Sequence, residues 1–379
     1  MSNVYLILNV FVWALTLILY FKKKRQIDVG LVLILSFLLF SISSYIHFNT
    51  SSKYSELSLY PFVYLYFMII LIMYPILKFD FNKIVKIQKP SNFLFYTIIF
   101  IYILSSLINF LLNINNIYTG IFTIITDPNG GIEIYRDTMN NSFNVGDGVI
   151  SNIFALTSNI FSDIGILLFF YYLTFKNKNK YLLIAFSISI IASILTPIAQ
   201  SQRGPAVDRF LTVIIAYFAL YKYLPKSINI LIKKLGFILV ILFTIPIVSI
   251  TLSRFGDREG RAKESVFEYI GQQNLNFIND MDFHLNFNNY GFDNGGLRYG
   301  DRTFPLFKRM LGYENVPINF WERRIKYPNL KINDEVFIGF VGDFVLDFGP
   351  IVTVIIFIIF TINSTVKTRI RNNTLLFHK

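Results

Sequence analysis

The sequence predicts an all-α integral membrane protein whose helices cross the bilayer several times. Of its 379 residues, 54% are hydrophobic and 15% are charged, and the mean hydropathy is +0.52. A soluble domain of this composition would leave too much apolar surface in water, so lipid must be the solvent for most of the chain. We expect a bundle of about nine to eleven transmembrane helices and one large external loop that contains short amphipathic helices.

Nine apolar blocks define the predicted spans, which cover residues 4–21, 29–46, 60–77, 92–112, 149–175, 181–199, 209–224, 235–253 and 336–362. Each block can cross about 30 Å of hydrocarbon when tilt is allowed. The first block is followed at once by residues 22–25, Lys-Lys-Lys-Arg, so it is predicted to be a retained span and not a signal peptide. Three regions result: residues 1–253 with eight spans, 254–335 as the large external loop, and 336–379 with the last span and a basic tail.

The hydrophilic stretches between the blocks alternate between two kinds. The short, basic kind comprises residues 22–25, 78–89, 176–180, 222–234 and 367–379. The longer kind, mixed in charge, comprises residues 47–59, 113–148, 200–208 and 254–335. Because cytoplasmic loops collect Lys and Arg, the basic kind is predicted inside, with the N-terminus outside and the C-terminus in the cytoplasm. The net charge of +12 is therefore a topology signal and predicts no nucleic-acid partner.

Two helices are predicted within the large external loop. Large apolar residues recur at three- and four-residue steps, at Phe267, Ile270, Phe277, Ile278, Met281 and Leu285. This spacing predicts an amphipathic helix that lies on the membrane surface. A second short helix is indicated over 303–311, with Thr303 as its cap and Pro305 in its first turn. The loop is thus expected to fold back on the bilayer.

A short polar interruption separates the blocks 181–199 and 209–224. Residues 200–205 read Gln-Ser-Gln-Arg-Gly-Pro, and Asp208 and Arg209 follow directly. Ionisable groups at the edge of the lipid are costly and usually face a polar cavity or a partner. Arg203 and Arg209 are therefore candidates for a polar site, the alternative being ordinary anchoring at the outer interface.

Further ionisable residues lie at both ends of the external loop. Arg254 and Arg258 follow the eighth block, in a stretch that also holds Asp257. Asp343 and Asp347 are four residues apart in the last block, so they share one face of a helix. For these two carboxylates, the alternative to a functional role is a structural pair with a neighbouring arginine or a helix N-terminus.

Several kinds of chemistry find no support in the sequence. Cysteine is absent, which excludes disulfides, thiolate nucleophiles and cysteine metal sites. The chain has no HExxH motif, no nucleotide-binding glycine motif and no aspartate-rich metal site, so we expect no metal, no cofactor and no cytosolic nucleotide-sugar donor. His284 lies in the external loop, where a lone histidine is more often a surface residue than a base.

Four short motifs follow one another between residues 200 and 350: Ser-Gln-Arg-Gly at 201–204, Phe-Glu-Tyr-Ile-Gly at 267–271 with Asn276 and Phe277 after it, Gly-Asp-Arg-Thr-Phe at 300–304, and Gly-Asp-Phe-Val-Leu-Asp-Phe-Gly at 342–349. In order and in predicted topology this region resembles the oligosaccharide repeat-unit polymerases of O-antigen and capsule assembly, of the Wzy type. The first half of the chain shares only its hydropathy with that family.

The resemblance implies a glycosyltransferase of the bacterial cytoplasmic membrane. It would move a growing glycan from its polyprenyl diphosphate carrier to the non-reducing end of another lipid-linked repeat unit, and so build O-antigen or capsular polysaccharide. Polyprenyl-diphosphate-linked oligosaccharides and the lipid bilayer are the implied partners, with a chain-length regulator and a repeat-unit flippase beside them.

Arginine suits the leaving diphosphate because its planar fork binds phosphate oxygens in pairs. The position of Arg203 in the matched motif implies that it binds the diphosphate, assisted by Arg254, Arg258 and Arg302. The resemblance leaves Asp343 and Asp347 as structural residues, or as residues that orient these arginines.

The acceptor hydroxyl needs alignment, with or without a general base. External carboxylates and the histidine are the candidates for that base, and they are Glu268, Glu264, Asp257 and His284. Glu268 is preferred because it lies in a matched segment.

Three other functions compete with this interpretation. A ligase-like transferase would use the same lipid diphosphate donor with a different acceptor. A transporter or flippase for lipid-linked sugars would need no chemistry, but transporters tend to show paired repeats and helices broken at the midplane. A membrane scaffold or immunity protein would have no obvious use for the external arginines and carboxylates.

Overall fold

The computed structural model describes residues 1–25, 27–51, 53–54, 56–79, 91–127, 130–141, 149–234, 236, 250, 261–285, 297–317, 320–328 and 338–374. Of these residues, 84% are helical, and none lies in a strand. Seven of the described helices are long and apolar enough to cross a membrane. The prediction of an all-α, multi-pass membrane protein is therefore confirmed.

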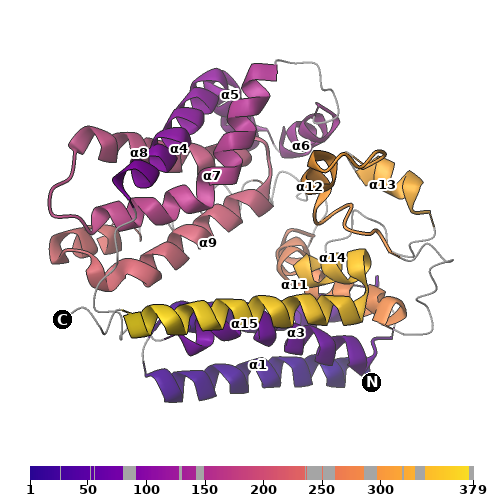
Figure 1. Cartoon of the computed structure of the whole chain (residues 1–379). Coiled ribbons are helices and arrows are strands. Elements are labelled where there is room, and N and C mark those ends of the chain that lie inside the picture. Colours follow the sequence, from indigo (N-terminus) through magenta and orange to yellow (C-terminus); the bar gives the residue numbers. More distant parts are fainter. Residues whose placement is uncertain are drawn as a thin grey trace. The chain divides into compact units, whose positions relative to one another are not determined.

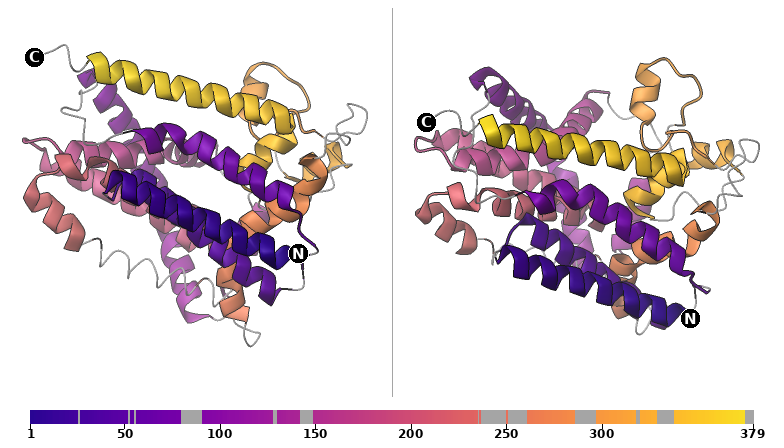
Figure 2. Two further views of the ribbon diagram at one scale, coloured as in Figure 1. Left: turned by 90° about the horizontal axis from the view of Figure 1, so that it is seen from below. Right: turned by 60° about the horizontal axis from the view of Figure 1, so that its bottom comes forward.

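The chain divides into two compact units. The first unit combines the two ends of the sequence, Met1–Lys86 and Lys263–Lys379, and the second is the continuous stretch Ile87–Ala262 between them. Figure 1 labels most of the helices of each unit, and Figure 2 gives two further views.

Unit 1 contains the first three and the last helices of the chain. Its described helices are α1 (Ser2–Lys24), α2 (Val29–Thr50), α3 (Leu59–Lys78), α11 (Arg261–Leu285), α12 (Pro305–Met310), α13 (Phe320–Lys326), α14 (Gly339–Phe348) and α15 (Pro350–Thr374). Helices α1 and α2 pack together, and α15 packs on α3. The three predicted spans 4–21, 29–46 and 60–77 are confirmed as the long apolar helices α1, α2 and α3.

Hydrogen bonds join the ends of these long helices. The amide of Leu57, just before α3, donates to Ser2 Oγ at the start of α1, over 2.9 Å. Tyr64 Oη donates to the carbonyl of Pro350, where α15 begins, over 2.9 Å. At the opposite end, Lys24 Nζ donates to Phe79 O over 2.9 Å. The basic C-terminal ends of α1 and α3 therefore lie together, away from the start of α15.

The predicted amphipathic helix of the external loop exists as α11, but its apolar face does not lie on a membrane surface. Phe277, Ile278 and Met281 are buried in the core of unit 1, together with residues of α1, α3, α14 and α15. The close approach is possible because Gly271 lies against the backbone of α2, where a Cβ atom would be 2.6 Å from the Ser43 carbonyl carbon. Ser44 Oγ also donates to Gly271 O over 2.9 Å.

The prediction of one continuous span over 336–362 is wrong. Helices α14 and α15 meet at a bend of 119°. Gly349 takes φ 80° and ψ 164°, a conformation essentially restricted to glycine. Pro350 follows it as the first residue of α15, a position where its missing N–H costs no hydrogen bond. With ten residues, α14 is about 15 Å long and too short to cross a bilayer.

Unit 2 is a bundle of its own. Its described helices include α4 (Asn92–Leu112), α5 (Ile114–Thr126), α6 (Gly130–Asn141), α7 (Val149–Leu173), α8 (Lys180–Ala199), α9 (Arg203–Leu220) and the short η2 (Tyr221–Tyr223). Helix α7 packs on α4 and α9, and α8 packs on α4 and α9. Four predicted spans, 92–112, 149–175, 181–199 and 209–224, are confirmed as long apolar helices. The eighth predicted span, 235–253, lies outside the described residues apart from Gly236 and Ile250.

Candidate functional site

The polar interruption at 200–205 forms a tight turn between α8 and α9. Ser201 has φ 55°, in the left-handed region, and its side chain is buried. The amide of Ser201 donates to Ile198 O over 2.9 Å, and that of Gln202 donates to Pro197 O over 2.8 Å. These two bonds cap the last carbonyls of α8 in the pattern that glycine usually completes. A serine held in this conformation carries backbone strain, which tends to persist at functional sites.

A polar cavity of about 410 Å³ lies beside this turn, inside the helices of unit 2. Helices α4, α7, α8 and α9 all contribute to its wall. Most of its lining side chains are amides and hydroxyls, among them Ser106, Asn109, Ser158, Asn159, Ser193 and Thr196. Gln200 and Gln202 of the turn line it as well. Buried polar groups in a membrane bundle are retained where they face a ligand, water or one another, and here they face a cavity.

Arg209 supplies positive charge at the cavity wall. It lies on α9, and its guanidinium forms an ion pair with Asp163 of α7. Thr212 Oγ1 donates to the same carboxylate over 3.3 Å. The Arg209 side chain is 16% exposed and that of Asp163 is 62% exposed. The pair therefore lies at the rim, with the arginine turned inward and the carboxylate outward.

A second cavity of about 560 Å³ adjoins the first. Helices α5, α6 and α8 line it, and it shares Asn113, Thr196 and Gln200 with the first cavity. Asp137 of α6 contributes a carboxylate. Together the two cavities form a polar region around the C-terminal end of α8.

Arg203, the first choice for a diphosphate ligand, is the first residue of α9. It follows Gln202, whose side chain lines the cavity. The Arg203 side chain itself is outside the described part of the structure.

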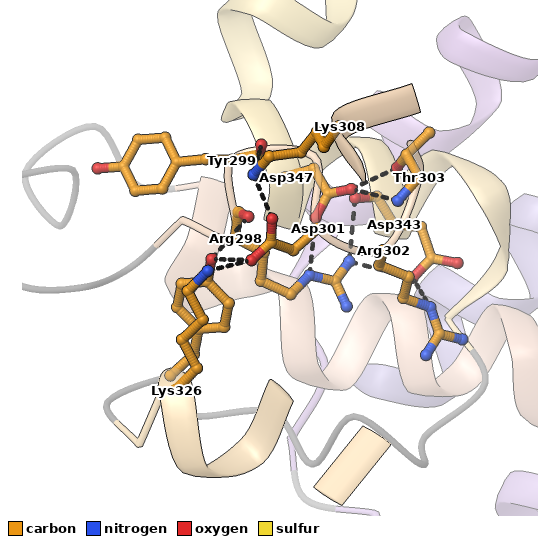
Figure 3. A network of polar contacts seen from close by, with 10 residues as sticks. Arg298, Tyr299, Asp301, Arg302, Thr303, Lys308, Lys326, Asp343 and Asp347 are labelled. Carbon is orange, nitrogen blue, oxygen red and sulfur yellow. Dashed lines mark hydrogen bonds and ion pairs between the residues drawn. The ribbon is translucent and has the colours of Figure 1, made fainter. Parts of the chain in front are cut away.

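A network of charged side chains in unit 1 connects the loop 297–303 to α14 (Figure 3). Arg298 is 1% exposed, and its Nε lies 2.9 Å from Asp347 Oδ1. Its Nη2 lies 3.1 Å from Asp343 Oδ1, and Arg302 Nε lies 2.8 Å from the same oxygen. The amide of Thr303 donates to Asp347 Oδ2 over 2.8 Å. The two carboxylates share a face of α14, as their spacing predicts, and both contact Arg298.

The role predicted for Thr303 as a helix cap is wrong. Helix α12 begins at Pro305, with Phe304 as its N-cap residue and no capping hydrogen bond from a side chain. The Thr303 hydroxyl instead donates to Asp347. Pro305 occupies the first turn, as predicted.

Asp301 is the centre of a second cluster, next to the first. Lys308 and Lys326 both pair with its carboxylate, the latter over 2.7 Å, and Tyr327 Oη donates to it over 2.6 Å. Burial alone would raise the pKa of Asp301, but the bonds from the two lysines and the tyrosine outweigh it and hold the pKa below its usual value. This carboxylate is therefore ionised at neutral pH and fixes the start of α12.

Glu268, the preferred candidate for a general base, lies on α11 with its side chain half-buried. The charge of Glu268 acts on the Tyr54 hydroxyl, which donates to Asn276 Oδ1 over 3.0 Å. Burial is the main cause that raises the pKa of Tyr54, and the charges of Glu268 and Asp280 raise it further.

The remaining predicted site residues are placed only in part. Arg254, Asp257 and Arg258 lie outside the described residues, and of Glu264 and His284 only the backbone, in α11, is described. Arg302 and its partner Asp343 belong to unit 1, whereas Arg203 belongs to unit 2.

The sequence patterns single out neither Asp163 nor Arg298. Asp163 is a lone acid within an apolar block, and that position is a signal that could have found it. Arg298 lies in a loop rich in both charges, where no local pattern separates it from its neighbours.

Among the described residues, no group of three or more His, Asp or Glu side chains is placed to hold a metal ion. A comparison of the chain with protein-family models, curated proteins and solved structures gives no match.

Proposed function

We propose that this protein polymerises polyprenyl-diphosphate-linked oligosaccharide repeat units into O-antigen or capsular polysaccharide, at the outer face of a bacterial cytoplasmic membrane. The observation that carries the proposal is the polar cavity beside the α8–α9 turn. Its volume of about 410 Å³ is in the range of small-ligand sites. Amide and hydroxyl side chains are the groups that exchange hydrogen bonds with sugar hydroxyls.

The charge at the cavity wall fits the other half of such a substrate. A glycan on a lipid diphosphate carries anionic oxygens next to its first sugar, and arginine binds them in pairs. Arg209 lines the cavity, and Arg203 begins the same helix one residue after the cavity-lining Gln202. We assign the leaving diphosphate to Arg203, with Arg254 and Arg258 of the same unit as assisting residues.

The donor glycan, the acceptor hydroxyl and a general base account for every bond made and broken in this reaction. The bond between the anomeric carbon of the donor glycan and the diphosphate oxygen breaks, and the diphosphate leaves on its lipid with the bonding electrons. The acceptor hydroxyl oxygen bonds to the anomeric carbon, and its proton passes to a general base. Glu268 is the first candidate for that base, followed by Glu264, Asp257 and His284. No cofactor is needed for this transfer.

A matched pair of serines on α8 tests the role of the cavity. Ser193 lines it, and its hydroxyl donates to Ile190 O over 2.8 Å. Ser187 is half-buried on the same helix, donates to Leu183 O over 2.9 Å and is not a lining residue. In cells lacking this gene, Ser193→Leu should fail to restore long glycans because leucine fills the cavity, whereas Ser187→Leu should restore them. Glycan length on a gel is the readout.

Arg203→Ala tests the diphosphate assignment, with Lys180→Ala at the opposite end of α8 as its control. The first should leave single repeat units, and the control should give the wild-type ladder. A wild-type ladder from both Ser193→Leu and Arg203→Ala would overturn the proposal. Glycan that is polymerised but stays on its lipid carrier would indicate a ligase, and repeat units trapped on the cytoplasmic side would indicate a flippase.

A further inference from the structure

Helix α12 exposes a cluster of large apolar side chains outside the membrane-spanning helices. Leu306, Phe307, Met310 and Leu311 are 55%, 62%, 74% and 76% exposed. At 100° per residue they occupy one side of the helix. In a spanning helix, lipid would cover such residues, but α12 has only six residues and is not a span. Apolar clusters exposed outside the core mark interaction sites.

The position of α12 within unit 1 indicates what covers this face. The ring of Phe304, directly before α12, lies 6.0 Å from the rings of Phe344 and Phe348 of α14. The amide of Arg298 donates to Leu346 O over 2.9 Å. Leu346 lies three residues before Gly349, and α15 begins directly after that glycine. The start of α12 is therefore fixed beside the end of a spanning helix, which is the level of the lipid headgroups.

The positive charge next to the apolar face also indicates a membrane surface. Lys308 and Lys326 share the single carboxylate of Asp301, so this cluster keeps a net positive charge. Arg309 is exposed on α12, and its Nη2 donates to Pro317 O over 2.8 Å. On α13, Ile325 is 80% exposed beside an exposed Arg324. Apolar side chains flanked by cations are typical of segments that lie in the interface of anionic membranes.

We propose that α12, with Ile325 of α13, lies on the membrane surface and binds bilayers that contain anionic phospholipid. The apolar face enters the boundary between headgroups and acyl chains, while Arg309 and Arg324 contact phosphates. Since Asp343 and Asp347 of α14 hold the loop that leads into α12, the contact fixes the external loop at a defined height above the bilayer. This inference does not depend on the proposed glycan chemistry.

The absence of cysteine allows a direct test on the full-length protein. Met310→Cys carries an environment-sensitive fluorophore, and Glu314→Cys, exposed in the turn after α12, is the matched control. Both are reconstituted in vesicles of equimolar phosphatidylcholine and phosphatidylglycerol. The label at 310 should be quenched several-fold more by a nitroxide near the top of the acyl chain than by aqueous iodide, and the label at 314 should show the reverse.

The charge component is tested with vesicles of phosphatidylcholine alone and with the Arg309→Gln/Arg324→Gln variant. Nitroxide quenching at 310 should fall in both cases. Equal iodide quenching at 310 and 314 would overturn membrane contact, and equal nitroxide quenching with and without phosphatidylglycerol would overturn the anionic preference. Protection at 310 from both quenchers would show a protein partner on this face and would also contradict the proposal. Unchanged circular dichroism verifies that each variant is folded.

Discussion

At the scale of single residues, the largest fully buried side chain described is a charged one, Arg298. Desolvating a guanidinium is costly, and the cost is offset only if its partners are placed well. Asp347, itself fully buried, and Asp343 supply these partners. Such a cluster adds little net stability compared with apolar residues, but it admits only one arrangement of the loop against α14.

Arg298→Met should therefore destabilise the protein by about 3–5 kcal/mol, because the Asp347 carboxylate would remain buried without its cation. The double variant Arg298→Met/Asp347→Leu should recover most of this loss, since both charges are removed. Thermal unfolding in detergent, followed by circular dichroism, measures the difference. A double variant that is no more stable than Arg298→Met would contradict this interpretation.

Residue roles could be predicted from the sequence where they depend on spacing. The shared face of Asp343 and Asp347 follows from the four-residue interval, but the identity of their partner does not. Arg298 contacts Asp343, which is 45 residues further along the chain. No local sequence pattern predicts that contact. The prediction of Thr303 as the cap of α12 is wrong for a related reason. Its hydroxyl donates to the Asp347 carboxylate, which is distant in the sequence, and so it does not cap α12.

At the scale of elements, hydropathy predicts the long apolar helices well, but it does not predict the break between α14 and α15. The window average over 336–362 is apolar throughout, so the break at Gly349 is invisible to it, although the Gly-Pro pair is a signal for a bend. The three- and four-residue pattern of α11 predicted its apolar face correctly. It could not predict what covers that face, because a protein core and a membrane surface select the same residues.

The crossing of α2 and α11 depends on the size of Gly271. In Gly271→Ala, the new Cβ atom would lie 2.6 Å from backbone atoms of Ser43 and Ser44, so the helices must separate. We expect a loss on the order of 1–3 kcal/mol despite the better helix propensity of alanine. Gly236→Ala, where a Cβ atom meets nothing within 4 Å, should be neutral or slightly stabilising. Unfolding midpoints of the two variants make the comparison, and indistinguishable values would disprove the tight crossing.

At the scale of the whole molecule, the ends of the long helices of unit 1 separate by charge. Residues 22–25 and Lys78 lie at one end, and Ser2, Leu57 and Pro350 lie at the other. The positive-inside rule therefore predicts that the first end is cytoplasmic.

Single cysteines test this orientation in right-side-out membrane vesicles. Asn3→Cys and Tyr313→Cys should react with a membrane-impermeant maleimide, because both positions are exposed and predicted outside. Lys23→Cys should react only after the vesicles are permeabilised. Labelling of Lys23→Cys in sealed vesicles would reverse the predicted topology.

The construction of unit 1 from both ends of the chain has a consequence for biosynthesis. The hydrogen bonds from Ser44 to Gly271, from Tyr64 to Pro350 and from Thr361 to Leu71 join residues 227, 286 and 290 positions apart. At typical rates of translation, α1 to α3 remain in the membrane without these partners for a time on the order of tens of seconds, while all of unit 2 is made. A nonsense codon shortly before α15 would thus leave unit 2 complete and α3 permanently without its partner α15. The incomplete unit 1 would then be exposed to the proteases that degrade misassembled membrane proteins.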